Sequence, residues 1–250
     1  ANGVIGSAVR EHLGGRYELS ALDMRPGDFP THVANIADLD AIQPAFEGVD
    51  AVVHLAASIS VETPWPDILR DNIIGTYNVY EAAKRAGAGV VVFASSNHAV
   101  GMYEVTNSPD IHATDHPLVI DQHAEIRPDS YYGVSKAYGE AMGRYYVDNH
   151  GLRVFCLRIG SVRADDSPTS EAAAASSGWL PLTREQTLQR LQATWLSQRD
   201  CAQLISRCLD ADHISFGIYY GISDNPRQMW SLANARAELG YAPEDSAARR

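Results

Sequence analysis

The chain has 250 residues, 45% of them hydrophobic, which is enough to bury the core of one sizeable α/β domain with a small appendage. Its formal net charge is −11, and it has no cluster of Lys and Arg to contact phosphates, which argues against a nucleic-acid partner. The longest apolar runs, such as residues 89–94, are far shorter than the roughly 20 residues of a membrane-spanning helix. We therefore expect a soluble protein with no membrane partner.

The cysteines indicate the compartment. Cys156, Cys201 and Cys208 cannot all pair within one chain, and none belongs to a Cys-x-x-Cys arrangement. This favours a reducing cytoplasm, and we expect no metal site.

Short β-branched or apolar runs alternate with longer helical patterns, which is typical of βαβ units around a parallel sheet. The predicted strands lie near Glu18–Met24, His32–Asn35, Ala51–Ala56, Val90–Ser95, Arg153–Ile159 and Gly217–Gly221. The predicted helices lie near Val4–Leu13, Leu39–Phe46, Ile73–Ala86, Ser130–Asn149, Gln186–Ala193, Asp200–Asp210 and Met229–Leu239. Gly87 and Gly151 follow two of these helices, where glycine most easily adopts a left-handed stop. The sequence thus predicts an α/β fold with a Rossmann-type doubly wound parallel sheet.

One segment shows no such pattern. Between Ala164 and Pro181 the composition shifts to Ala, Ser, Pro and Asp without periodicity. We predict a mobile loop there.

The first residues resemble part of a phosphate-binding turn. Residues 1–9 contain Gly3-x-x-Gly6 and run into an amphipathic helix, and a strand ending at Asp23 follows. An acidic residue about 20 positions after the turn is the spacing of a dinucleotide site, where glycines let the backbone approach a pyrophosphate. Asp23 is expected to bond the adenosine ribose hydroxyls and to repel a 2′-phosphate, which favours NAD over NADP, although Arg25 softens that preference. The bland alternative is a tight turn with an exposed aspartate.

This interpretation has consequences for the domains. A dinucleotide fold needs a strand and a first glycine before Gly3, so we predict that roughly 6–12 residues precede Ala1 in the native protein. We assign residues 1–160 to an NAD-binding Rossmann domain that lacks this first strand. Residues 161–250 form a small substrate-binding portion, with strands and helices interleaved with the main domain.

A phenol and an ammonium are four residues apart on one predicted helix. Tyr132 and Lys136 lie about 40° apart around the helix axis, whereas Tyr131 lies about 140° from Lys136. The lysine charge, and that of an oxidised nicotinamide, is expected to lower the pKa of Tyr132 from about 10 toward neutrality, so that it acts as a general base.

A strand end supplies polar partners for this pair. The segment 93–98 follows a buried strand at the edge where a doubly wound sheet binds ligands. We expect Ser96 to hydrogen-bond the reacting hydroxyl; the bland alternative, an ordinary turn, is favoured for Ser95.

These motifs together resemble the extended short-chain dehydrogenase/reductase, or NAD-dependent epimerase/dehydratase, family over essentially the whole chain. The motifs are Gly3-x-x-Gly6, Asp23, His54-Leu55-Ala56-Ala57, Asn72, Ser95-Ser96 and Tyr132-x-x-x-Lys136. The resemblance implies that Ser96, Tyr132 and Lys136 are catalytic. One departure is Asn35-Ile36, where the family has an acidic residue beside the adenine. The cofactor-binding residues expected from motif and resemblance are Asn2, Gly3, Val4, Ile5, Gly6, Asp23, Asn35, Ile36, Leu55, Ala56, Ala57, Asn72, Lys136 and Ile159.

Three further segments resemble the uronate dehydrogenases: residues 95–98, 158–161 and 190–195. Residues 96–101 and 220–225 resemble the archaeal NAD-dependent glucose-6-phosphate dehydrogenases. The resemblance implies a sugar pocket formed by Ser60, Ser96, Asn97, His98, Ser161 and Arg190. Arg190 would hold the anionic end of the sugar, since a guanidinium matches a carboxylate or phosphate. The bland alternatives are a solvated helix arginine and, for His98, a turn histidine.

Three functions follow as hypotheses. The first is oxidation of C1 of an anionic aldose, either a hexuronate or, as the runner-up, a sugar phosphate, giving a lactone and NADH. The second is a nucleotide-sugar epimerase, which usually needs a larger C-terminal domain than the roughly 90 residues that follow the Arg153–Ile159 strand. The third is a non-catalytic dinucleotide sensor, which has no need for Ser96, Tyr132 and Lys136 together. The family analogy also implies a homodimer.

Overall fold

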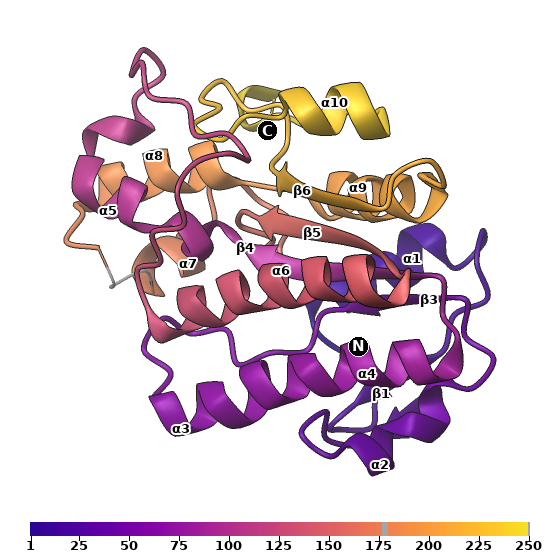
Figure 1. Cartoon of the computed structure of the whole chain (residues 1–250). Helices are drawn as coiled ribbons and strands as arrows, with labels where there is room; N and C mark the ends of the chain where they lie inside the picture. The colour runs from indigo at the N-terminus through magenta and orange to yellow at the C-terminus, as the bar shows by residue number, and fades with distance from the viewer. Residues whose placement is uncertain (177–179, 250) are drawn as a thin grey trace.

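The computed structural model describes residues 1–176 and 180–249 (Figure 1). Its strands form two parallel sheets. Strands β1 (Ala21–Asp23) and β2 (Thr31–Val33) pair with each other, and the larger sheet has the order β3 (Ala51–His54), β4 (Val90–Ser96), β5 (Arg153–Ile159) and β6 (Phe216–Gly221). The predicted parallel α/β architecture is confirmed.

Alternate side chains of the central strands enter two different cores. In β4, Val90 and Val92 pack in one apolar cluster, whereas Val91 and Phe93 pack in the other. All seven β4 residues are buried. A strand buried on both faces needs helices on both sides, which explains its continuous run of apolar residues.

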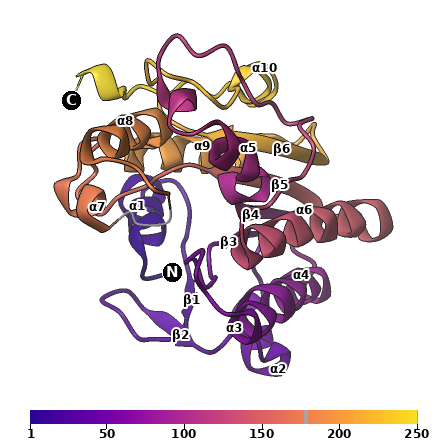
Figure 2. The same ribbon diagram turned by 90° about the vertical axis from the view of Figure 1, so that its left-hand side faces the viewer.

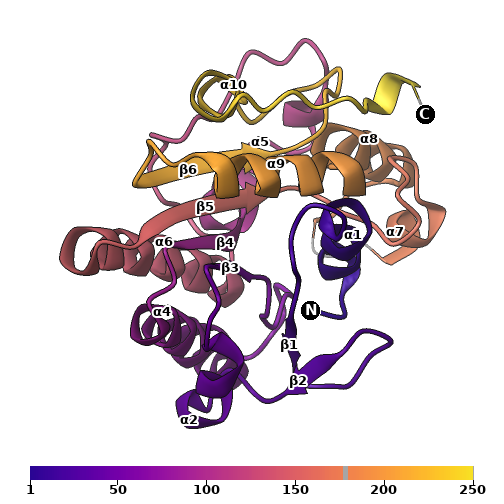
Figure 3. The ribbon, with the colours of Figure 1, turned by 90° about the vertical axis from the view of Figure 1, so that its right-hand side faces the viewer.

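The helices cover both faces of the larger sheet. Helices α4 (Gly75–Ala86) and α6 (Tyr131–His150) lie on one side, and α1 (Val4–Leu13) and α9 (Gln198–Asp210) lie on the other (Figures 2 and 3). The remaining α-helices are α2 (Leu39–Ile42), α3 (Trp65–Asp67), α5 (Met102–Asn107), α7 (Glu171–Ser176), α8 (Arg184–Thr194) and α10 (Ala233–Leu239). Short helical turns are η1 (Gln43–Phe46), η2 (Ile68–Ile74), η3 (Asn97–Val100), η4 (Asp110–His112) and η5 (Ala247–Arg249).

Local signals set several helix ends. Gly87 and Gly151 end α4 and α6 with φ angles of 76° and 72°, the left-handed conformation that glycine adopts most easily. The Oγ of Ser130 accepts a hydrogen bond from the Gly133 N–H and so caps the start of α6. That cap fixes where the helix carrying Tyr132 begins.

The structure corrects three element predictions. The segment Ala164–Pro181 is not simply irregular, because α7 occupies Glu171–Ser176, where four alanines favour a helix; residues 177–179 lie outside the described part. The helix predicted from Ile73 is preceded by α3 and η2 from Trp65 onward. Helix α10 begins at Ala233 rather than Met229, because Trp230 forms a β-bridge with Ile120. Helix α5 was not predicted.

The three cysteines are buried and unpaired. Within the described ranges, no helix combines the length and the apolar character needed to cross a bilayer.

Candidate active site

The carboxyl end of β4 meets the first turn of α6. Ser96 is the last residue of β4, and η3 follows it directly. The approach of α6 to η3 requires a glycine, because a Cβ at Gly133 would lie 2.3 Å from the backbone oxygen of His98. Tyr132 directly precedes this glycine, so the close approach holds Tyr132 against the end of β4.

Tyr132 and Lys136 are both buried, with 8% and 5% exposure, whereas Tyr131 is 57% exposed. The Nζ of Lys136 lies 5.4 Å from the centre of the Tyr132 ring and donates a 2.7 Å hydrogen bond to the backbone oxygen of Ala94. The helical spacing thus brings Tyr132, and not Tyr131, to the lysine.

Burial shifts the pKa values of these two groups in opposite directions. Burial raises the pKa of Tyr132 to about 12, although a hydrogen bond with Ser96 lowers it in part. Burial lowers the pKa of Lys136 to about 7, opposed by the charge of Glu140. The expected lowering of the phenol pKa by Lys136 is not found, because desolvation of the phenolate is the largest effect. The expected contribution of an oxidised nicotinamide stays a prediction.

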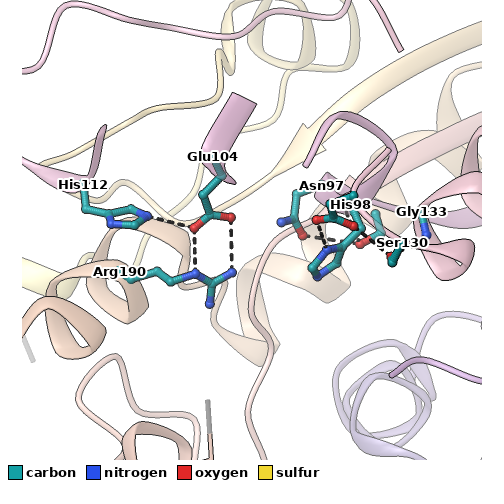
Figure 4. Close-up of polar contacts among 9 residues, drawn as sticks. Asn97, His98, Glu104, His112, Ser130, Gly133 and Arg190 are labelled. Carbon is teal, nitrogen blue, oxygen red and sulfur yellow. Dashed lines mark hydrogen bonds and ion pairs between the residues drawn. The ribbon is translucent and has the colours of Figure 1, made fainter. Parts of the chain in front are cut away.

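His98 is fixed by a carboxylate that the sequence interpretation missed. Its Nδ1 lies 2.7 Å from Oδ2 of Asp129, whose side chain is 1% exposed. The His98 ring lies edge-on to Tyr132, with 5.5 Å between ring centres. Asn97 is buried, and the Oγ of Ser96 donates to its Oδ1 at 3.3 Å. Asn97 and His98 thus contact Ser96 and Tyr132. Both lie near Ser130 (Figure 4).

Asn72 ties the β3 side of the site to α6. It lies in the π-helical segment η2, and its Nδ2 donates to Oγ of Ser135 at 2.9 Å and to the Ser58 oxygen at 3.0 Å. Its Oδ1 accepts from the Ser58 N–H at 2.8 Å. The π-helical turn, a feature frequent at functional sites, aims this amide at the helix of Tyr132.

A buried ion pair stands one turn beyond Lys136. The Nε and Nη2 of Arg158 each donate at 2.8 Å to the carboxylate of Glu140, which also accepts from the Ser95 hydroxyl at 2.6 Å. The Nη1 of Arg158 donates to the Tyr220 hydroxyl at 2.9 Å. This network links β4, β5, β6 and α6 behind the catalytic candidates.

The predicted phosphate-binding turn precedes α1. Gly3 is the N-cap of α1, no side chain caps the helix, and its first turn has no acidic residue. A Cβ at Gly6 would lie 1.9 Å from the Ala1 oxygen, so this close turn requires glycine. The Asn2 N–H donates at 2.8 Å to Asp23 at the end of β1. The uncapped N–H groups and the adjacent carboxylate fit a pyrophosphate with a ribose beside it.

The other expected cofactor residues lie at the carboxyl ends of β2, β3 and β5 or at the start of α1. Leu55, Ala56 and Ala57 follow β3 and are half-buried, and Ile159 ends β5. Ile36 is buried, and its carbonyl accepts from Asn78 at 2.8 Å. The Oδ1 of Asn35 accepts a 2.9 Å hydrogen bond from the Ala37 N–H, an Asx-type turn that shapes the loop after β2. Val4 and Ile5 begin α1.

The expected sugar-binding residues are less uniformly placed. Ser60 is exposed in a turn, where its hydroxyl accepts from the Glu62 N–H. The Ser161 hydroxyl lies 2.9 Å from that of Thr194, directly after β5. Whether these residues bind sugar stays a prediction.

Arg190 belongs to a buried cluster and is not a solvated helix residue. Its Nε lies 2.6 Å from Oε1 of Glu104, which His112 also contacts at 2.8 Å through Nε2 (Figure 4). Burial would raise the pKa of Glu104, but the charge of Arg190 and the bonds from both partners lower it to about 2. The guanidinium is thus neutralised by a carboxylate.

Three functional residues that the sequence did not predict share one property. Asp129, Glu104 and Glu140 each serve a partner at least eight residues away. Only Asp129 left a local signal, because it directly precedes the Ser130 helix cap.

Residues 1–210 match the family described as the NAD dependent epimerase/dehydratase family. The chain belongs to this family.

Individual relatives sharpen the assignment. The chain is 39% identical to a Haloferax volcanii protein named NAD-dependent glucose-6-phosphate dehydrogenase, over 99% of this chain and 92% of that protein. It is 37% identical to a uronate dehydrogenase of Pseudomonas syringae pv. tomato, over 98% and 80% of the two chains. A uronate dehydrogenase variant from Agrobacterium tumefaciens, solved with NAD, superposes with a TM-score of 0.80 at 31% identity, over 99% of this chain and 83% of that one.

These findings confirm the predicted family, the Rossmann-like fold and NAD as the cofactor. The chain is an NAD-dependent oxidoreductase.

Proposed function

We propose that this enzyme oxidises C1 of an anionic aldose, a hexuronate in the first instance, to its lactone. The observation that carries the proposal is the buried arrangement of Ser96, Tyr132 and Lys136 at the carboxyl end of β4, beside Asn97 and His98. Relatives named uronate dehydrogenase and glucose-6-phosphate dehydrogenase support a sugar substrate.

The residues present fit NAD. The N-terminus of α1 and Asp23 would hold its pyrophosphate and ribose, and Lys136 would reach the nicotinamide end. When bound, NAD supplies the acceptor for the hydride from C1.

The protein's own groups handle the proton. Ser96 orients the C1 hydroxyl, and Tyr132 takes its proton. An isolated phenolate or ammonium is costly in this buried site, which is why the pKa of Tyr132 is high and that of Lys136 is low. When both groups are charged, each stabilises the other, so the proton leaves Tyr132 most easily while Lys136 is protonated.

Arg163 is suited to hold the substrate anion, and its charge interacts with that of Arg190. It follows Ser161 by two residues, it is half-buried, and its Nε is buried without a hydrogen-bond partner in the described part of the chain. Desolvation, and then the charge of Arg190, lowers the pKa of Arg163. A carboxylate or phosphate beside the two guanidinium groups relieves that repulsion. We therefore assign sugar binding to the 161–250 portion, with Ser60, Asn97 and His98 facing it.

A substrate panel tests the proposal. Purified enzyme with NAD is assayed for NADH absorbance with glucuronate, galacturonate, glucose 6-phosphate and neutral glucose. We expect the highest kcat/KM with a uronate. A preference for glucose 6-phosphate would move the assignment to a sugar phosphate. No turnover with any sugar, despite NAD binding, or interconversion of a nucleotide sugar without NADH release, would reject it.

The anion contact is tested by Arg163→Gln. We expect KM for the anionic sugar to rise by about tenfold or more, with little change for a neutral aldose. Arg207→Gln, an exposed arginine on α9, is the matched control. Equal KM values for both variants would remove Arg163 from the site.

We also propose a homodimer formed through α4 and α6. These helices expose Tyr77, Tyr131, Val134 and Tyr145, which are 40–57% accessible in one chain. Exposed apolar side chains on two adjacent helices are typical of a helix-packing interface. A monomeric mass by light scattering at assay concentration would contradict it.

A further inference from the structure

A cavity that none of Ser96, Tyr132 and Lys136 lines lies between α8, η4 and the C-terminal turn η5. It has a volume of about 200 Å³. Arg227 and His112 form its buried part, and the side chains of Thr114, Gln189 and Gln192 line its more open part. None of these residues belongs to the proposed catalytic or cofactor set.

Arg227 brings a positive charge with no carboxylate beside it. It is 5% exposed, and it donates to the backbone oxygens of Ile111, at 2.8 Å, and Leu118. No acidic group in the described ranges pairs with it, and desolvation alone lowers its pKa. The two other buried arginines, Arg158 and Arg190, each bind a glutamate. A buried charge without a counter-charge is costly, so an anion in this cavity would stabilise it.

His112 adds a second unsatisfied group. Its Nε2 lies 2.8 Å from the carboxylate of Glu104, while its Nδ1 is buried without a hydrogen-bond partner. Because Glu104 is ionised, Nε2 must be the donor in that bond, and in the neutral ring Nδ1 is then an acceptor. The cavity therefore combines the charged guanidinium of Arg227 with a histidine whose Nδ1 has no hydrogen-bond partner in the described part of the chain.

We propose that this cavity binds a phosphate group, either inorganic or carried by a small metabolite. Its lining has no acidic side chain, and Arg227, Gln189, Gln192 and Thr114 all supply donors for phosphate oxygens. For the neutral His112 ring, a protonated phosphate also supplies an O–H that Nδ1 would accept, which fully ionised sulfate lacks. The cavity is large enough for a phosphate and a short attached group, and too small for a dinucleotide.

Phosphate bound in this cavity would influence the proposed sugar site through the contacts that join His112, Glu104 and Arg190. His112 and Arg190 share the carboxylate of Glu104, so a ligand that holds the His112 ring also steadies the partner of Arg190 (Figure 4). If the proposed function is correct, we expect phosphate to change KM for the sugar without competing for its site.

The test measures binding directly, so it does not depend on turnover. The NAD-loaded enzyme is titrated with inorganic phosphate, glycerol 3-phosphate and sulfate by calorimetry. We expect one phosphate site per chain, with sulfate weaker by about tenfold or more. Tighter binding of glycerol 3-phosphate than of inorganic phosphate would indicate a metabolite as the source. No saturable binding of either phosphate, or equal binding of sulfate, would overturn the proposal.

Variants locate the site. Gln192→Glu places a negative charge in the cavity and should weaken phosphate by about tenfold, whereas Gln122→Glu adds the same charge outside its lining and should not. Arg163→Gln should leave phosphate binding intact, which separates this cavity from the proposed substrate site. Arg227→Gln should abolish binding, with circular dichroism to verify folding. Equal phosphate affinity in wild type and Gln192→Glu would place the phosphate elsewhere and reject the cavity.

Discussion

The buried cations of this protein fall into two groups. Arg158 and Arg190 each face a buried carboxylate, at 2.8 and 2.6 Å. Lys136 and Arg227 are equally buried, but each donates only to backbone carbonyls in the described part of the chain. The four side chains are thus similarly buried, but only Arg158 and Arg190 have a carboxylate that balances their charge.

This difference separates charges that the fold itself compensates from charges that have no counter-charge in the described part of the chain. A paired charge has recovered much of its lost hydration from its partner, and its removal leaves that partner uncompensated. An unpaired charge keeps most of the desolvation cost until a ligand or a second charge arrives. Lys136 fits a role beside a phenolate and a cofactor, and Arg227 fits a role beside an anion.

Removal of Lys136 should give the largest effect on rate. We expect Lys136→Met to lower kcat by about 10²–10⁴-fold, because Tyr132 then loses the charge that stabilises its phenolate. The measurement is the rate of NADH formation at saturating sugar and NAD. Lys84→Met, at the other lysine, should change kcat less than twofold or so.

The same variant should become more stable, which no structural role of Lys136 would allow. Because burial lowers its pKa from 10.5 to about 7, the unfolded chain holds this proton more tightly than the folded protein between those values. The cost of burying the charged Lys136 ammonium therefore lowers the free energy of unfolding in full below pH 7, and this cost disappears as pH rises to 10.5. Denaturant titrations at several pH values should show a gain for Lys136→Met that fades over this range. A variant less stable than wild type at pH 6 would contradict it.

Removing one partner of a buried ion pair should lower stability, whereas removing Lys136 should raise it. We expect Glu140→Gln to lower the free energy of unfolding by about 3–5 kcal/mol, since Arg158 is then buried without its carboxylate. Asp148→Asn breaks an exposed pair with Arg144 and should cost at most about 1 kcal/mol. Urea unfolding measures both. A similar small loss in the two variants would remove the distinction between buried and exposed pairs.

The smallest effect is expected at Asp129, which acts through His98. Asp129→Asn should retain the fold and raise KM for the sugar by about tenfold, with a smaller change in kcat, because the imidazole loses its fixed orientation. Steady-state kinetics separate the two constants. A fall in kcat with KM unchanged would assign Asp129 to the chemical step instead.

The sequence alone predicted the elements that carry the chemistry. The apolar run before Ser96, the Ser130 cap and the four-residue spacing of Tyr132 and Lys136 are local signals, and the structure has β4 and α6 where they indicate. The Glu171–Ser176 helix was missed because alanine-rich composition was read as a loop.

The sequence did not predict which buried charges pair with one another. Arg190 looks like a substrate-binding arginine in the sequence, and only the fold reveals Glu104, 86 residues away, against it. Glu140 and Arg158 are 18 residues apart on a helix and a strand. The high pKa of Tyr132 likewise depends on burial, which spacing cannot supply.

Isotope transfer tests the central claim, hydride removal from C1, most directly. Glucuronate deuterated at C1 is turned over by the enzyme with NAD, and the NADH is examined by mass spectrometry and by rate. We predict one deuterium in each NADH and a slower rate with the labelled sugar when hydride transfer limits turnover. Unlabelled NADH from this substrate would contradict C1 oxidation and require another reacting carbon.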